Sequence, residues 1–170
     1  LHTHTPPMNR RNILSILLFT SLYFQTMAQN SWFPMVLPEK ERAEVVDKWI
    51  AERAEKVLPG IMRRSGIDMW IIVSSEYNED PVIRTLLPAT WHAARRTTIL
   101  VAFDPGEGKA LETFGISRYN TGEVFHTEWD REAQPDQWKA LAEMVSDKDP
   151  KTIGINKSRT FPLADGLSAT

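Results

Sequence analysis

Two continuous apolar runs, Met69–Val73 and Thr97–Phe103, most strongly limit the folds open to this chain. Neither run alternates between apolar and polar residues, so each predicts a strand covered on both faces of a sheet, as in α/β proteins. Asp104–Gly108 is rich in turn-forming residues and precedes a third predicted strand, Ala110–Ile116. These two strands predict a hairpin with a loop of about five or six residues. Thr152–Ile155 predicts a short fourth strand.

Helical patterns lie on either side of these runs. Between Glu39 and Ser65 the apolar residues recur about every four positions, which predicts a long amphipathic helix. Pro59 predicts a kink or a break in it, because proline donates no backbone hydrogen bond, and Gly66 supplies a C-terminal stop. Asp136 predicts the N-cap of a second amphipathic helix. Together the elements predict an α/β fold, a mixed β-sheet flanked by helices.

The beginning of the chain has the pattern of an export signal. Residues 8–28 contain a basic start, an apolar stretch over 13–24, and small residues at Thr26 and Ala28. This order predicts a signal peptide that is cleaved between Ala28 and Gln29. A buried N-terminal helix and an uncleaved membrane anchor are the alternatives.

The apolar stretch is too short to span about 30 Å of hydrocarbon as a helix, so no stable membrane anchor is expected. The protein is therefore predicted to be exported, to the periplasm or out of the cell. Residues 1–7 precede the first Met and are interpreted as upstream read-through. Residues 29–38, with two aromatic residues and two prolines, predict an extended segment that leads into a folded domain over 39–170.

Composition excludes several classes of function. The 170 residues suffice for one domain, and a net charge of −2 lacks the excess of Lys and Arg that a nucleic-acid partner requires. Because the chain has no cysteine, disulfides, thiol nucleophiles and cysteine-based zinc sites are excluded. The sequence contains no dinucleotide-binding, P-loop, nucleophile-elbow or His-Glu-x-x-His motif. Asn156-Lys157-Ser158 matches a glycosylation sequon, a pattern that often arises by chance.

The group His126-x-Glu128-x-Asp130 is one candidate for metal binding. On a strand, residues two apart project from one face, and one histidine with two carboxylates suits a divalent metal. No second histidine lies nearby, and a solvated strand edge accounts for the same residues. Metal binding is kept as a third possible function of the chain.

The segment from Ser74 to Arg96 is long for a connection between two buried strands, and long connections often carry function. Two interpretations are open. In the first, a short helix follows Pro88 and its arginines point to solvent. In the second, a loop presents Trp91 and His92, with Arg95 and Arg96, to a substrate or a partner domain.

Several motifs distributed over Glu39–Thr170 resemble one family. The chain is similar to the N-terminal domain of the creatinase, aminopeptidase P and prolidase group, the pita-bread metallopeptidases. The residues that carry the resemblance are Glu41-Arg42, Arg64–Ile72, Asn78-Glu79-Asp80-Pro81, Ala94–Thr97, Trp129-Asp130 and Ile153–Asn156.

The resemblance implies a hydrolase acting on peptide bonds, commonly next to proline, through two divalent metal ions such as manganese, cobalt or zinc. In the family the metal ligands and catalytic histidines lie in a C-terminal domain, so no catalytic or metal-binding residue is expected here. Asp165–Thr170 resembles a helix start, and we expect the domain to be truncated before a catalytic domain.

The predicted function is therefore that of a non-catalytic N-terminal domain in an exported Xaa-Pro aminopeptidase or prolidase-like enzyme. The resemblance implies contacts with the missing catalytic domain, assembly into a homo-oligomer, and control of access by the peptide substrate. Trp91, His92, Arg95 and Arg96 are the candidates for that access role. The alternative is a self-contained secreted binding module of the same fold without hydrolase activity.

Overall fold

The computed structural model describes residues 36–77, 80–106 and 108–157. The predicted signal peptide over 8–28, its cleavage site at Ala28 and Gln29, most of the 29–38 segment, and the helix start near Ser168 lie outside these residues. The chain divides into a unit over Leu1–Pro38 and a unit over Glu39–Thr170, and every described helix and strand belongs to the second. Within the described residues no helix is long and apolar enough to cross a membrane.

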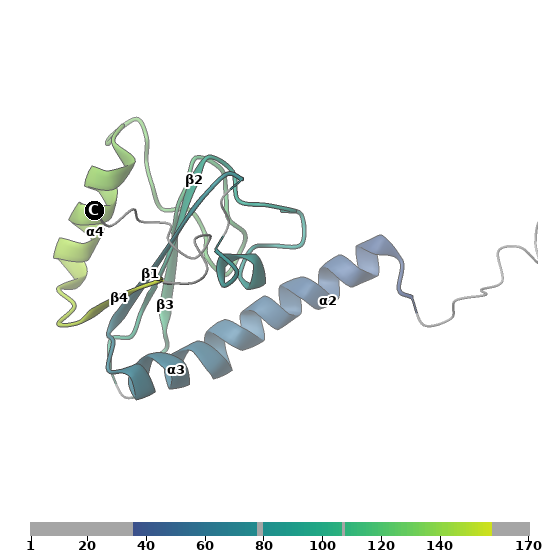
Figure 1. The fold of residues 1–170 in the computed structure, drawn as a ribbon, viewed down its shortest axis with the longest axis horizontal. Coiled ribbons are helices and arrows are strands. Elements are labelled where there is room, and N and C mark those ends of the chain that lie inside the picture. Colours follow the sequence, from purple (N-terminus) through teal and green to yellow (C-terminus); the bar gives the residue numbers. More distant parts are fainter. Residues whose placement is uncertain (1–35, 78–79, 107, 158–170) are drawn as a thin grey trace, which may run out of the picture. The chain divides into compact units, whose positions relative to one another are not determined.

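A mixed four-stranded sheet with the order β3-β2-β1-β4 forms the centre of the fold (Figure 1). Strand β1 pairs antiparallel with β2 and parallel with β4, while β2 pairs antiparallel with β3. The strands are β1 (Met69–Ser75), β2 (Thr97–Phe103), β3 (Glu112–Ile116) and β4 (Ile153–Ile155). The predicted mixed sheet with flanking helices is thereby confirmed.

Apolar clusters lie on both faces of the sheet, which explains why β1 and β2 are continuous apolar runs. Alternate residues of β1 enter opposite clusters: Ile72 packs with the first helical segment, while Ile71 and Val73 pack with the last helix. A strand with two buried faces needs apolar residues at odd and even positions alike. Figure 1 shows helices on both sides of the strands.

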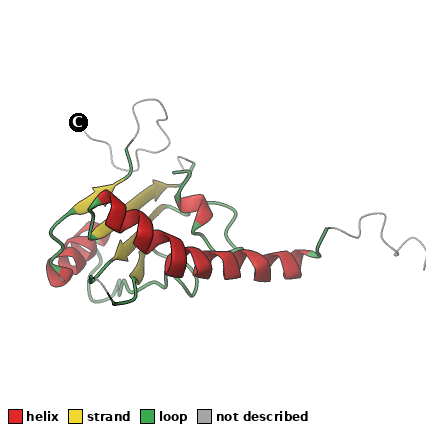
Figure 2. Cartoon of the chain, turned by 90° about the horizontal axis from the view of Figure 1, so that it is seen from below, coloured by secondary structure: helices red, strands yellow, loops and turns green. Residues whose placement is uncertain are grey.

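The first helical segment consists of α2 (Glu39–Glu52), a π-helical stretch η1 (Arg53–Val57) and α3 (Leu58–Ser65). Pro59 stands at the start of α3, where its missing N–H and its ring would disturb the regular bond to the carbonyl of Glu55. One wider turn absorbs this disturbance, so the helix continues past the proline. Figure 2 shows the helical segment as one long element that extends beyond the strands. Gly66 ends it in the left-handed conformation, with φ of 65°, as predicted.

The last helix, α4 (Gln137–Lys148), begins where the sequence predicted. The Asp136 side chain accepts hydrogen bonds from the backbone N–H groups of Trp138 and Lys139, which makes it the N-cap. Leu141 is buried against the second apolar cluster, so α4 covers the face of the sheet opposite α2 and α3.

The loop between β2 and β3 is longer than the predicted five or six residues, because it spans 104–111. Asp104, expected as a simple turn residue, is buried and accepts two hydrogen bonds from Arg63, at 2.6 and 3.0 Å. Its carboxylate also accepts the Gly106 N–H at 3.1 Å. This pairing ties the loop to α3, and β3 begins only at Glu112.

We expect Asp104→Asn to lower the free energy of unfolding at neutral pH by about 1–3 kcal/mol, since it removes the charge that pairs with Arg63. The hydrogen bond from Arg63 holds the pKa of the Asp104 carboxyl below its usual range. A lowered pKa in the folded state stabilises the fold above the ordinary carboxyl pKa, and this contribution is lost as the pH falls through the folded-state value. Urea titrations from pH 7 down into the acid range measure this, and the difference between the two proteins should narrow as the pH falls below the ordinary carboxyl pKa.

The matched control is Glu128→Gln, which removes one charge from the exposed pair of His126 and Glu128. Its effect should stay within about 0.5 kcal/mol. Equal losses of unfolding free energy in the two variants would show that the Arg63–Asp104 pair stabilises the fold no more than an exposed pair does.

Candidate functional site

Residues 76–96, referred to below as the 76–96 loop, connect two neighbouring antiparallel strands. The loop is closed at its base, where the Glu76 N–H donates to the Arg96 carbonyl at 2.7 Å. The Arg96 N–H in turn donates to the Glu76 carboxylate at 3.1 Å. Tyr77 and Arg96 have φ angles of +68° and +54°, values that side chains other than glycine rarely adopt. Such strained positions cluster at functional sites.

Asp80 fixes the first half of the loop, and only 1% of its surface is exposed. Its carboxylate accepts the N–H groups of Val82 and Ile83, at 2.6 and 3.2 Å. Its own N–H donates to the Ser74 hydroxyl at 3.2 Å. These bonds start the 3-10 helix η2 (Ile83–Thr85), which directs Ile83 into the core.

Asn156, directly after β4, joins this arrangement from the far end of the sequence. Its amide donates to the second Asp80 oxygen at 2.7 Å and accepts the Trp70 indole N–H at 2.7 Å. The chain of hydrogen bonds therefore joins β1, the 76–96 loop and the end of β4.

The second half of the loop packs on the first apolar cluster. Leu86 and Leu87 are buried in it, the Arg53 side chain donates to the Thr85 carbonyl, and the Ala89 N–H donates to the Asp47 carboxylate at 2.9 Å. The loop is therefore part of the layer that α2 and α3 form on this face of the sheet.

The interpretation of a short helix after Pro88 is wrong. The helical turn in the described part of the loop is η2, which precedes Pro88 and follows the bond from the Val82 N–H to the Asp80 carboxylate. After Pro88 the chain makes a turn, with the Trp91 N–H donating to the Pro88 carbonyl at 2.8 Å. It then extends to join β2, and the Thr98 hydroxyl bonds to both the N–H and the carbonyl of Arg95.

The four predicted site residues line two separate recesses. Trp91 is half-buried on the first apolar cluster and His92 is exposed, and both line a groove of about 710 Å³ beside the N-terminal half of α2. Arg95 and Arg96 line a different recess of about 430 Å³ together with Glu76, Tyr77 and Tyr119. We call this second recess the arginine pocket.

The Arg95 guanidinium contacts two aromatic rings, so the expectation that it simply points to solvent is incomplete. Its central carbon is 5.5 Å from the centre of the Trp91 ring and 5.4 Å from that of Tyr119. Both distances fall within the range of cation–π contacts, which attract the guanidinium without using its N–H donors. The sequence analysis missed Tyr77 and Tyr119. Only the fold brings Tyr119, in the segment after β3, beside the 76–96 loop.

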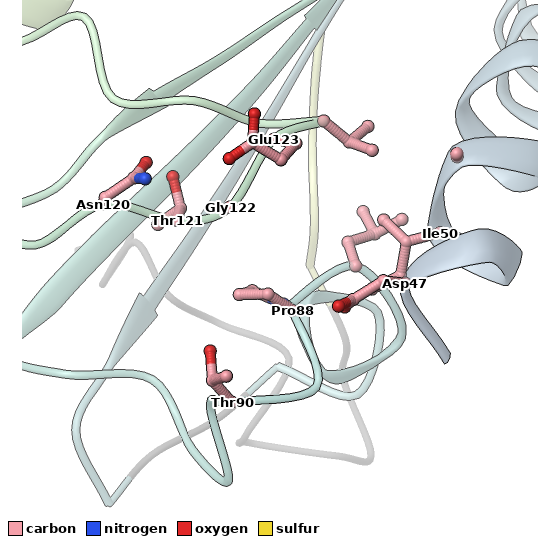
Figure 3. A pocket seen from close by; sticks show the side chains of 11 residues that line it. Asp47, Ile50, Pro88, Thr90, Asn120, Thr121, Gly122 and Glu123 are labelled. Atoms are coloured by element: carbon pink, nitrogen blue, oxygen red, sulfur yellow. The ribbon is translucent and has the colours of Figure 1, made fainter. Parts of the chain in front are cut away.

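A third recess lies between α2 and two loops (Figure 3). Asp47 and Ile50 of α2 face Pro88 and Thr90 on one side and the stretch from Asn120 to Glu123 on the other. The cavity has a volume of about 370 Å³, within the range of small-molecule pockets.

The proposed metal ligands His126, Glu128 and Asp130 do not converge. His126 Nε2 lies 2.9 Å from a Glu128 oxygen, and both side chains are exposed. The Asp130 carboxylate instead accepts the N–H groups of Glu132 and Ala133 in the following turn. Among the described residues no group of three His, Asp or Glu side chains is arranged to hold a metal ion.

Comparisons with protein-family models, with curated proteins and with solved structures give no match to the chain. The resemblance to the pita-bread metallopeptidases therefore stays a prediction based on the motifs.

We expect Asn156→Ala to lower the free energy of unfolding by about 1–3 kcal/mol, because it leaves Asp80 and Trp70 each without one hydrogen-bond partner. Chemical unfolding followed by circular dichroism measures the change. The neighbouring exposed Lys157→Ala serves as control and should alter stability by less than about 0.5 kcal/mol. An Asn156→Ala variant as stable as the parent would show that the hydrogen-bond chain does not hold the loop.

Proposed function

We propose that the chain is the non-catalytic N-terminal domain of an exported metallopeptidase of the Xaa-Pro aminopeptidase and prolidase type. In this proposal residues 8–28 direct export to the periplasm or the exterior. The folded unit contributes contacts within a homo-oligomer and narrows the path of the peptide substrate to the active site. The catalytic domain belongs to polypeptide beyond the 170 residues.

The observation that carries the proposal is the presentation of Trp91, His92, Arg95 and Arg96. The 76–96 loop is tied to the sheet at its base and through Asp80, yet it keeps His92, Arg95 and Arg96 exposed. A fixed loop with exposed aromatic and cationic groups suits the border of a substrate channel, since rigid elements position binding groups best. The α/β fold agrees with the architecture that the resemblance implies.

Two metal ions in the proposed catalytic domain would polarise the scissile carbonyl and supply hydroxide. The described residues of this chain do not fit that role, because they contain no arrangement of three such ligands. The contribution of this chain is to bind, orient and exclude: Trp91 and His92 line the groove beside α2, and the arginines select against cationic groups.

The test begins with the coding sequence that follows Thr170. We expect it to continue for roughly 200–300 residues and to include the Asp, His and Glu ligands of a two-metal site. The extended protein should hydrolyse Xaa-Pro peptides with manganese, while the 170-residue chain alone should not. Metal-dependent turnover by the chain alone, or a stop codon after Thr170, would contradict the proposal and favour a self-contained binding module.

Within the extended protein, Trp91→Ala should raise KM for long peptides by about 5-fold or more, because truncating a contact aromatic typically costs about 1 kcal/mol or more. The kcat for a dipeptide should remain unchanged, since the loop makes no contact with the reacting atoms. Trp138→Ala, at an exposed tryptophan on α4, is the control. Equal effects of the two variants on KM would contradict the access role.

A further inference from the structure

The arginine pocket combines features that point to a specific ligand chemistry. It is lined by Glu76, Tyr77, Arg95, Arg96 and Tyr119, and it lies where β1 ends and β2 begins. Its two arginines are adjacent in sequence, and its two tyrosines come from different segments. Tyr77 is 92% exposed, so its ring is accessible to a ligand.

Three neighbouring groups position Arg95: the rings of Trp91 and Tyr119 and the hydroxyl of Thr98. The ring centres of Trp91 and Tyr119 lie 5.5 and 5.4 Å from its central guanidinium carbon, and the buried Thr98 hydroxyl bonds to its backbone N–H and carbonyl. Cation–π contact uses none of the N–H donors of the guanidinium, which form a rigid planar fork. The fork matches the two oxygens of a carboxylate or phosphate, and little side-chain entropy remains to be lost on binding.

Arg96 supplies a second cation, and its backbone adopts a left-handed conformation that is strained for a residue other than glycine. Its φ of +54° is held by the two hydrogen bonds with Glu76, and Tyr77 on the facing strand end has φ of +68°. Two strained residues side by side indicate that the conformation is kept for a purpose other than stability.

The charge balance of the pocket favours an anion. The residues that line it carry two guanidinium groups and one carboxylate, and that carboxylate already accepts the Arg96 backbone N–H. Neither Arg95 nor Arg96 forms an ion pair within the described part of the chain. An incoming oxyanion would therefore meet unneutralised donors, whereas a cation would be repelled.

The geometry points to a binding site for an oxyanion carried by an apolar or aromatic group. The oxyanion, a carboxylate or a phosphate, accepts hydrogen bonds from Arg95 and Arg96, and the attached group lies against Tyr77 and Tyr119. This inference rests on the proposed function, which names the source of the oxyanion. That source is the free C-terminal carboxylate of a peptide bound at the 76–96 loop.

The experiment is a calorimetric and NMR titration of the chain with matched probes. N-acetylphenylalanine carries the carboxylate, N-acetylphenylalaninamide lacks the charge, phenyl phosphate carries the alternative oxyanion, and inorganic phosphate lacks the ring. We expect the two charged aromatic probes to bind, the amide to bind at least about 10-fold more weakly, and added salt to weaken binding. The tighter of the carboxylate and phosphate probes identifies the source of the oxyanion.

Arg95→Gln should weaken binding of the charged probes by about 10-fold or more, because it removes the stacked fork of donors. Arg131→Gln is the matched control, since Arg131 also stacks on a ring, that of Trp129 at 5.7 Å, but lies outside the pocket. Arg95→Lys keeps the charge and loses the fork, so it should bind less well than the parent and better than Arg95→Gln. Circular dichroism of each variant verifies folding.

Three outcomes would overturn the inference: equal binding of the acid and the amide, unchanged binding in Arg95→Gln, or no binding of any probe at concentrations up to about 20 mM. These outcomes are separate from failure of the proposed function. The titration uses the chain alone and needs no turnover, whereas the proposed function depends on the downstream sequence and on hydrolysis.

Discussion

The hydrogen bonds that join Trp70, Asn156 and Asp80 are the interaction on which the rest of the structure depends. They connect β1 and the 76–96 loop that directly follows it to the end of β4, where Asn156 lies 76 positions after Asp80. A buried carboxylate without these partners would be costly, so the loop adopts a path that satisfies Asp80. That path starts η2, buries Ile83 and sets the direction in which the loop returns to β2.

The anchored 76–96 loop forms the recessed surface at the end of β1 and the start of β2. Because its apolar residues complete the layer formed by α2 and α3, the loop cannot shift without opening the core. The polar residues that follow are therefore held at fixed positions, with Arg95 in contact with two rings and the Arg96 N–H bonded to Glu76. The strain at Tyr77 and Arg96 is supported by this rigid base.

Much of the fold is predictable from local sequence, because each element carries its own signal. Burial on both faces produces the apolar runs of β1 and β2, and Asp136 caps α4 as its position indicates. The longer β2–β3 loop was not predictable, since Arg63 captures Asp104 from 41 positions away. The candidate site was predictable only in part: its arginines lie in a conspicuous loop, but Tyr119 joins them through the tertiary fold, and Asp80 meets Asn156 across 76 positions.

Native-state amide hydrogen exchange at Val82 and Ile83 tests the central claim most directly, because their N–H groups donate to Asp80. If Asp80 locks the loop to the sheet, these amides exchange only when the fold opens globally, at rates close to those of the central amides of β1 and β2. Exchange at these two amides as fast as in an exposed turn, while β1 and β2 stay protected, would contradict the account.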